Sequence, residues 1–572
     1  MLPVCTNRPP SPPFSLTSPW NSRFGIAGVG IVRAVVYVRT VVRNLPTCVR
    51  RSVVATSPIQ VIDLFAGPGG LGEGFSACGQ EEGREDFRVA LSIEKDAVAR
   101  TTLRWRAFTR ALYGRGVNGA HVIDALESHP RREQPEPAAL AGRGTVWREA
   151  AEEAEREAVC LELGPESRHW VDDRIADLTD TTRPWVLVGG PPCQAYSLVG
   201  RARNKGVVGY EARDDHRHFL YREYLHVLGH HAPPIFVMEN VKGILSAQVD
   251  AQEVFQAILS DLANPGEAIR SRRRPRYRIF SLTTGAELDD PRESVVRMEE
   301  WSVPQRRHRV ILVGVRDDLS TSPRSLGRAG AAQVPLRSVI GDLPALRSGL
   351  SRAADTWEAW REVVQGTAIR PDLPASLRHQ IARASGDLRR SGTLGRGADF
   401  LAATAVPGAL GDWYAAHPTG RILNHATRGH MASDLQRYFF AAVFAAEQAR
   451  SPALGDFPPG LLPEHENVKG VANPIFADRF RVQVWDQPST TVTSHISKDG
   501  HYFIHPDPRQ CRSLTVREAA RLQTFPDDYF FCGPRTEQYR QVGNAVPPFL
   551  ARRIAEVVRD VLNGVSRSPS PS

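Results

Sequence analysis

The chain has 572 residues, 41% of them hydrophobic, and a formal net charge of +9. A chain of this length exceeds one ordinary core and should divide into at least two lobes. Its seven cysteines are scattered, without a CxxC pair or zinc-type His/Cys spacing. This pattern argues against a disulfide framework or a structural zinc, and it predicts a reduced, cytoplasmic protein with no bound metal.

The positive charge lies mostly in the N-terminal extension. Residues 1–62 contain seven arginines, no lysine and no acid, which leaves +2 for the rest of the chain. Global charge is therefore weak evidence for a polyanionic partner. Residues 1–56 are predicted to be a disordered extension or the product of an early start codon, although their composition also resembles a transit peptide. Their apolar stretch is interrupted by Arg33 and is too short to cross a bilayer, and no other segment could cross one.

A strand and a glycine-rich turn open the folded part of the chain. The segment IQVIDLFAGPGGLGEGF at 59–75 combines a β-branched run with glycines at 67, 69 and 70, and a helix should follow. Such glycines let the backbone approach a nucleotide. The next predicted strand, at 87–98, contains Glu94, which could take both hydroxyls of a ribose. No phosphate-binding Lys-Ser/Thr pair follows the glycines, so a nucleoside-type cofactor is expected.

The stretch from about 100 to 180 interrupts the alternation of strands and helices. Its segment WREAAEEAEREAVCLELG at 147–164 has the composition of an acidic, alanine-rich helix with a solvated face. We predict a helical insertion that carries no chemistry.

Buried strands resume with WVLVGG at 185–190, which runs into GGPPCQAYSL and places Cys193 at the carboxyl edge of a sheet. A second buried strand, IFVMENV at 235–241, carries Glu239 near its end. Further on, Gln305, Arg307 and Arg309 alternate on entry to another strand. Because side chains two apart share a face of a strand, these three could converge on one small ligand.

Six segments, taken in order, resemble the motifs of the DNA (cytosine-5)-methyltransferases. They are DLFAGPGG at 63–70, GGPPCQAYS at 189–197, ENV at 239–241, QRRHRV at 305–310, RSLTVREAARLQTFPDDY at 512–529 and QVGNAVPP at 541–548. The resemblance covers about 57–562 apart from the insertion and the variable stretch before 470. Six motifs in the right order are far more specific than any single one.

The resemblance implies an α/β fold with a doubly wound, mostly parallel sheet, the S-adenosylmethionine-dependent methyltransferase fold, and a smaller target-recognition lobe. We expect the catalytic and cofactor-binding domain at 57–317, the recognition lobe at 318–510, a return to the catalytic domain at 511–562 and a disordered tail at 563–572.

The resemblance also implies the chemistry. Carbon 5 of cytosine is a poor nucleophile, so a thiolate must first add to carbon 6 of a flipped-out base. Cys193 resembles that nucleophile. Glu239 resembles the residue that holds N3 and the exocyclic amine, and Arg309, with Arg307 nearby, the one that meets O2. The methyl group would come from S-adenosyl-L-methionine.

Further residues are assigned by the same resemblance. The expected cofactor-binding residues are Phe65, Gly67, Gly69, Gly70, Glu94, Asn544 and Val546. An acid near the adenine amine could be Asp172 or Asp177, and Asp177 is favoured. The residues expected in the mobile loop that closes over the flipped base are Gln194, Ser197, Arg201 and Asn204.

The recognition lobe is less informative. His425 and His430 are five apart with no third partner, so contacts to backbone or DNA phosphate are expected rather than zinc. The segment 485–506 is predicted to form a hairpin of Thr/Val strands. Arg517 and Glu518, on an amphipathic helix at 514–526, are expected to tie the lobes together.

The resulting prediction is a DNA (cytosine-5)-methyltransferase that acts on a specific duplex sequence, in restriction-modification or phage defence. Its expected partners are double-stranded DNA and a cognate restriction endonuclease or defence-system protein. We expect a monomer in the bacterial cytoplasm, held at the nucleoid by DNA. The alternatives are a tRNA cytosine-5 methyltransferase and a non-catalytic DNA-binding regulator, although retention of Cys193, Glu239 and Arg309 together argues against the second.

Overall fold

The central sheet consists mainly of the strands that the sequence predicts. The computed structural model describes residues 57–179, 184–192, 216–245, 250–327, 332–390, 392–403, 405–463 and 479–564. Seven strands follow one another in the sheet, and β7 also pairs with β9. In sheet order they are β3 (Ala158–Cys160), β2 (Phe87–Glu94), β1 (Ile59–Leu64), β4 (Trp185–Gly189), β5 (Ile235–Val241), β9 (His308–Arg316) and β6 (Tyr277–Ser281), with β7 at Val295–Arg297.

The first five strands of this order are parallel to their neighbours, and β9 runs antiparallel to both β5 and β6. Their near-continuous apolar runs follow from this arrangement, because a parallel sheet is covered by helices on both faces. The expected doubly wound, mostly parallel α/β fold is confirmed.

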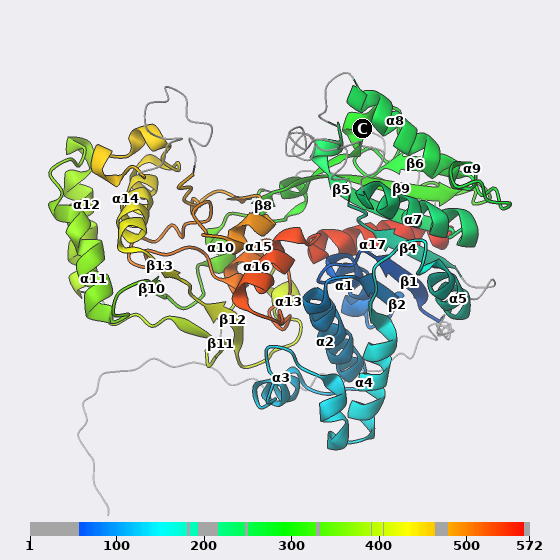
Figure 1. Ribbon diagram of the computed structural model, residues 1–572, viewed down its shortest axis with the longest axis horizontal. Helices are drawn as coiled ribbons and strands as arrows, with labels where there is room; N and C mark the ends of the chain where they lie inside the picture. The colour runs from blue at the N-terminus through cyan, green and yellow to red at the C-terminus, as the bar shows by residue number, and fades with distance from the viewer. Residues whose placement is uncertain are drawn as a thin grey trace, which may run out of the picture. The chain divides into compact units, whose positions relative to one another are not determined.

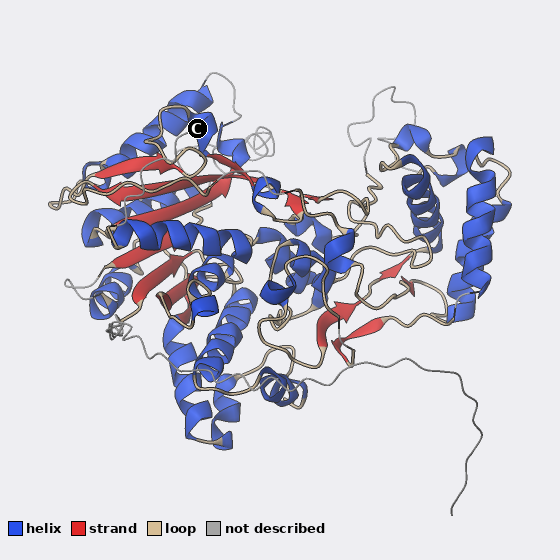
Figure 2. Cartoon of the chain, turned by 180° about the vertical axis from the view of Figure 1, so that it is seen from behind, coloured by secondary structure: helices blue, strands red, loops and turns tan. Residues whose placement is uncertain are grey.

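Helices cover both faces of the sheet (Figure 2). On one face Val61 of β1 packs in the same cluster as residues of α1 (Gly70–Ser76) and α17 (Pro548–Leu562). On the other face Ile62 and Leu64 of the same strand belong to a cluster formed with α5, α7 and α8. On this face α5 spans Arg168–Leu178, α7 spans His216–His231 and α8 spans Asp250–Ala263. A one-turn helix, α9 (Pro265–Ala268), follows α8 in the chain. The alternation along β1 is the period-2 pattern of a strand that is buried on both sides.

The segment 100–180 is not only a helical insertion, and this part of the prediction is wrong. It contains α2 (Ala97–Gly114), α3 (Gly119–Glu127) and α4 (Thr145–Glu157), but β3 follows α4 directly and pairs in parallel with the end of β2. The sequence concealed β3 because only three residues, Ala-Val-Cys, form it, and they follow the Ala- and Glu-rich helix α4 without a turn signal. The sheet therefore extends one strand further than expected.

A second group of helices lies in the predicted recognition lobe. α11 (Trp357–Gln365), α12 (Ala375–Arg390) and α14 (Ala432–Gln448) pack together around a separate apolar cluster (Figure 1). Short elements connect them: α10 (Arg337–Ile340), β10 (Gly349–Leu350), β11 (Gly397–Leu401), α13 (Gly411–Tyr414), β12 (Ile422–Ala426) and β13 (Gly429–His430).

The lobe shares part of its core with the C-terminal segment. Leu336, Trp413 and Val492 pack in one cluster with Leu514 and Phe549. That cluster contains residues on both sides of the expected boundary near 510, with α15 (Val516–Leu522) and α16 (Arg535–Asn544) among its elements. The segments 318–510 and 511–562 are therefore joined by a common core, while the domain boundaries themselves stay predictions.

The hairpin expected at 485–506 is not formed. β14 (Ser489–Thr490) instead pairs in parallel with β8 (Gln305–Arg306), far away in the sequence. A 3-10 turn at Ser494–Ser497 follows, within the first half of the expected hairpin and before its Asp-Gly pair at 499–500. Alternating Thr and Val fits any extended segment, so the pattern did not identify the pairing partner. Within the described ranges, every helix is too short or too polar to cross a membrane.

Candidate active site

The glycine turn after β1 is shaped by close contact with the C-terminal part of the chain. Gly69 has φ +92° and caps the N-terminus of α1, a conformation that glycine adopts without strain. A Cβ on Gly70 would lie 2.1 Å from the carbonyl oxygen of Val546. Phe65, with φ +59°, also holds a left-handed conformation. A larger residue at Gly69 would therefore be strained, and one at Gly70 would clash with Val546.

Glu94 holds this turn from the end of β2. Its Oε2 accepts a hydrogen bond of 2.9 Å from the amide of Gly67, and its Oε1 accepts one of 2.8 Å from the amide of Asp96. An ionised carboxylate offers about four acceptor positions, so Glu94 keeps capacity for the hydroxyls of a ligand. Glu94 and Gly67, both expected to bind the cofactor, are therefore in direct contact.

One cavity of about 330 Å³ lies at the carboxyl ends of β1, β2, β4 and β5. The expected cofactor residues that line it are Phe65, Gly67, Gly70, Glu94, Asn544 and Val546. Pro192, which precedes Cys193, and Glu239 line the same cavity. Its position agrees with the rule that ligands of open α/β sheets bind beyond the carboxyl ends of the strands.

Glu239, which lines the cavity, forms an ion pair with Arg309. The Nε of Arg309 lies 3.0 Å from Oε1 of Glu239, and each side chain is 14% exposed. The antiparallel pairing of β5 with β9 sets Val241 opposite Arg309. The neighbouring Asn240 donates a hydrogen bond of 3.0 Å to the carbonyl of Pro191. The end of β5 is thereby tied to the segment that leads to Cys193.

Arg307 and Gln305 do not point into this cavity, so the expectation that they converge with Arg309 on one ligand is wrong. The guanidinium of Arg307 is buried and donates to the carbonyls of Val492, Gly543 and Ala545, at 2.7, 3.4 and 2.9 Å. Burial, with the nearby charge of Arg309, lowers the pKa of Arg307 well below its usual range.

The Gln305 side chain is likewise bound within the protein, to Leu522 and Gln523. Because residues 305–306 pair with β14 instead of continuing β9, the alternation of one strand does not extend through all three residues. Arg307 thus does not line the cavity itself but donates to the carbonyl of Ala545, which does.

The two acids considered for the adenine amine lie outside the cavity. Asp177 is exposed on α5, and Asp172, on the same helix, hydrogen-bonds to histidines of α7. Leu161 and Leu163, directly after β3, line the cavity. The prediction of Asp177 depended on treating 100–180 as an insertion, and β3 removes that basis.

The predicted nucleophile and the loop after it cannot be compared with the structure. Cys193, Gln194, Ser197, Arg201 and Asn204 all lie outside the described residues. Their roles stay predictions.

The histidines of the recognition lobe are buried hydrogen-bonding groups. His425 Nδ1 lies 2.9 Å from the Thr515 hydroxyl, and burial lowers the pKa of His425 to about 4. His430 is also buried, with Nε2 3.2 Å from the Ser513 hydroxyl. Burial excludes both from contact with DNA phosphate, whereas the expected contact to backbone is present at His425, whose Nε2 lies 3.2 Å from the carbonyl oxygen of Pro344.

Arg517 has the expected linking role. Its guanidinium donates to the carbonyl of Leu423 at 2.8 Å and to that of Tyr529 at 2.6 Å. Glu518 pairs with Arg512 at 2.6 Å and completes a capping box with Thr515. The expected link between distant segments is confirmed for Arg517, whereas these two partners of Glu518 lie within six residues of it.

Asp63 lines the cavity but is not among the expected cofactor-binding or catalytic residues. Its side chain is 1% exposed at the floor of the cavity, within the DLFAGPGG segment. Burial raises the pKa of Asp63 to about 8, and the backbone of Gly72 offsets only part of this effect. The sequence signal for Asp63 is its position between Ile62 and Leu64 in a buried strand, where an acidic side chain is unusual.

Comparison with known proteins identifies a family whose model covers five of the six motifs, all except the one at 63–70. The family model described as C-5 cytosine-specific DNA methylase matches residues 169–358 and 428–560. The chain is 33% identical over 518 residues to the type II methyltransferase M.Bpa9945I of Bacillus paralicheniformis, covering 88% of this chain and 99% of that protein. It is 26% identical over 534 residues to the type II methyltransferase M.AgeI of Thalassovita gelatinovora, with 88% and 99% covered. The DNA (cytosine-5-)-methyltransferase M.ApeKI of Aeropyrum pernix is 27% identical over 411 residues, with 66% and 82% covered.

Proposed function

Because this chain belongs to the family of C-5 cytosine-specific DNA methylases and is a DNA cytosine-5 methyltransferase, we propose that it methylates a flipped-out cytosine in a specific duplex sequence through a covalent adduct with Cys193. One observation carries the proposal. The cavity lined by the glycine turn and Glu94 is also lined by Glu239 and by Pro192, the residue before Cys193. A methyl donor and a target base held at these two groups of residues would therefore be adjacent.

The residues of the cavity fit S-adenosyl-L-methionine. Glu94 has acceptor positions for the ribose hydroxyls, and Leu161 and Leu163 offer an apolar wall to an adenine ring. The turn at Gly70 and Val546 is too tight for a larger side chain. When bound, S-adenosyl-L-methionine supplies a methyl group on a positively charged sulfur, which carbon nucleophiles attack.

The proposed reaction begins at Cys193. Its thiolate adds to carbon 6 of cytosine, and the electron pair of the 5,6 double bond moves toward carbon 5, N3 and O2. Carbon 5 then forms a bond to the methyl group, whose bond to sulfur would break with its electron pair remaining on the departing thioether. A base, which is water in our proposal, removes the proton from carbon 5, and Cys193 leaves as the double bond forms again.

Glu239 and Arg309 act where negative charge develops on the ring. Groups fixed in position before the reaction stabilise such charge most effectively in a site that excludes water. Arg309 would donate to O2, and Glu239 would share a proton with N3 and accept from the exocyclic amine. Arg307 is a positioning residue here, because its guanidinium is occupied by three backbone carbonyls.

The target base must leave the duplex to reach these groups. We propose that the loop with Gln194, Ser197, Arg201 and Asn204 closes over it, and that the lobe at 318–510 reads the sequence. Two relatives, of which the chain covers 99% each, are named type II methyltransferases. We therefore propose that methylation protects host DNA from a cognate endonuclease, in the compartment that holds the genome.

The test uses tritiated S-adenosyl-L-methionine with either duplex DNA or tRNA. Wild type, Cys193→Ala and Cys160→Ala are compared, because Cys160 is an exposed free cysteine that does not line the cavity. We expect label in DNA as 5-methylcytosine with wild type and with Cys160→Ala, and none with Cys193→Ala. A duplex containing 5-fluorocytosine should trap a denaturation-resistant complex with the same two proteins, because carbon 5 then has no removable proton.

Equal labelling by Cys193→Ala would refute the covalent mechanism. Label in tRNA but not in DNA would refute the proposed substrate. Binding of DNA without any label would favour a regulator.

A further inference from the structure

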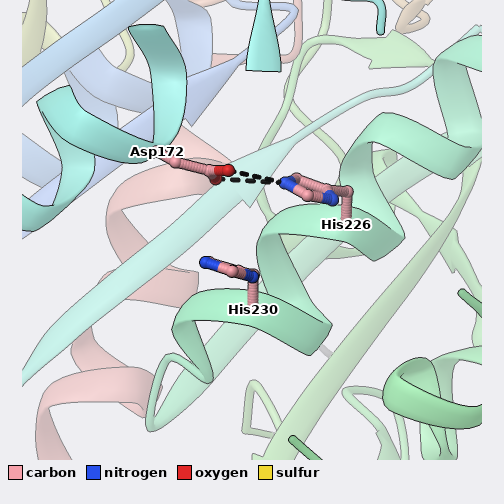
Figure 3. A group of neighbouring side chains, drawn as sticks. All are labelled: Asp172, His226 and His230. Carbon is pink, nitrogen blue, oxygen red and sulfur yellow. Dashed lines mark hydrogen bonds and ion pairs between the residues drawn. The ribbon is translucent and has the colours of Figure 1, made fainter. Parts of the chain in front are cut away.

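Three side chains with metal-binding atoms converge between α5 and α7. They are Asp172, His226 and His230, and among the described residues their ligand atoms form a group within 4.8 Å of one another. Figure 3 shows the carboxylate of Asp172 directed at His226, with His230 further along the same helix. None of the three lines the cofactor cavity.

The two histidines have the spacing of a helical chelating pair. Residues four apart on an α-helix lie on one face, one turn apart. The rings of His226 and His230 are nearly parallel, 12° apart, with centroids separated by 5.4 Å. Both imidazoles can therefore meet a ligand from the same side of α7.

The carboxylate of Asp172 completes the set. Its Oδ2 lies 2.9 Å from Nε2 of His226, and its Oδ1 lies 2.7 Å from Nε2 of His231. One oxygen can thus face a cation while the other accepts a hydrogen bond that fixes the carboxylate. Partners of this kind orient metal ligands in many proteins.

Two nearby guanidinium groups, those of Arg168 and Arg273, have hydrogen-bond partners other than Asp172. Arg168 makes a two-point contact with Glu223, at 2.8 and 2.7 Å. Arg273 donates to the carbonyl of His230 at 3.1 Å. Neither guanidinium therefore needs the carboxylate of Asp172 as its partner.

We propose that Asp172, His226 and His230 bind one Zn²⁺, with His231 as the positioning residue for the carboxylate. Two imidazoles and one carboxylate suit zinc, which takes four ligands, and His230 is exposed so that water can provide the fourth. The sequence predicted no metal, because it offered no cysteine pair and because Asp172 is distant from the histidines along the chain.

A cation at this position would join α5 to α7. Leu220 of α7 lines the cofactor cavity, and Tyr224 of the same helix donates to the carbonyl of Val237 in β5. The zinc site therefore stabilises a helix that forms part of the cavity wall without taking part in methyl transfer.

Untagged, chelator-treated full-length protein is titrated with Co²⁺, followed by visible absorption, and then with competing Zn²⁺. Bound zinc is counted by elemental analysis. The decisive variant is His230→Ala, because it retains the hydrogen bonds of Asp172 to His226 and His231 of α7. His379→Ala is the matched control, since His379 is an exposed histidine on α12.

We expect one Zn²⁺ per chain for wild type and for His379→Ala, and a loss of affinity of more than about 100-fold for His230→Ala and for His226→Ala. His231→Ala should lose about 10- to 100-fold, the usual effect of removing the partner of a ligand. Zinc should also raise the melting temperature of wild type but not of His230→Ala. Absence of stoichiometric binding to wild type, or equal binding by His230→Ala, would overturn the proposal and leave Asp172 as a hydrogen-bonding link between the two helices.

Discussion

The contact between the glycine turn and the C-terminal segment gives a quantitative prediction for Gly70→Ala. The added Cβ would lie 2.1 Å from the carbonyl oxygen of Val546, whereas ordinary contact begins at 3.4 Å. The segment would have to move by the difference, 1.3 Å. The carbonyl of Ala545 is held by Arg307 at 2.9 Å, which opposes that movement.

Overpacking of this kind costs about 1–3 kcal/mol. Since Gly70 and Val546 both line the cofactor cavity, we expect the cost to appear in cofactor binding. A cost of about 1.4 kcal/mol corresponds to a tenfold change. Gly70→Ala should therefore weaken binding of S-adenosyl-L-methionine by about 10- to 100-fold.

Isothermal titration calorimetry measures this loss, and thermal unfolding checks that the protein remains folded. Gly67→Ala is the control in the same turn, because a Cβ added to Gly67 would have no atom within 4 Å, although the backbone there has φ +57°. It should show only the strain of a left-handed alanine, about 1 kcal/mol. Affinity of Gly70→Ala within twofold of wild type would refute the close packing of the turn.

Three further predictions concern the same cavity. Glu94→Gln should weaken S-adenosyl-L-methionine binding about tenfold in calorimetry, because an amide replaces one acceptor oxygen; unchanged affinity would contradict the role of Glu94. Arg309→Lys should lower kcat about 100-fold in single-turnover methylation with little change in cofactor affinity, since lysine lacks the planar fork; equal losses in both would indicate a structural defect. Asp63→Asn should remove a pH dependence of stability. Folding raises the pKa of this carboxyl to about 8, so the folded state holds the proton more tightly and stability falls as pH rises from about 4 to 8, by up to about 5 kcal/mol. Denaturant unfolding at pH 5 and 8 measures this, and an identical pH dependence in Asp63→Asn would exclude Asp63 as the source.

The strands nearest the site were predictable because each has a local signal. The apolar runs of β1, β4 and β5 are long enough to be recognised, and each ends in glycines or polar residues where the chain reaches the sheet edge. The position of Glu94 at the end of β2 followed from the same reasoning. By contrast, the meeting of Glu239 with Arg309 depends on the antiparallel register of β5 and β9. No local pattern specifies that register, so this pair was accessible only through the resemblance.

The errors have a common physical cause. β3 is three residues long, and the partner of β14 is almost two hundred residues away in the sequence. Both elements owe their conformation to a neighbouring strand more than to their own residues, and strand propensity depends strongly on such context. Without β3, the sequence does not place Leu161 and Leu163 at the cavity. It points instead to Asp177, which lies on α5 outside the cavity.

The arginines give a final argument about how the site is maintained. Arg307, Arg512, Arg517 and Arg521 are among the largest fully buried side chains of the described residues. A guanidinium carries five donors in a planar fork and can bridge carbonyls from several segments at once. A count of arginines therefore overstates the charge that could meet DNA phosphates.

Arg307 makes the consequence specific. It binds the carbonyls of Gly543 and Ala545 beside the cofactor wall, and two residues later Arg309 pairs with Glu239. A single short segment thus fixes both the wall that would hold the methyl donor and the charged pair that would hold the base. Because the two halves of the site share this segment, a displacement of either half is transmitted to the other. Substitution of Arg307 should therefore impair cofactor binding and methyl transfer together, unlike substitution of Arg309.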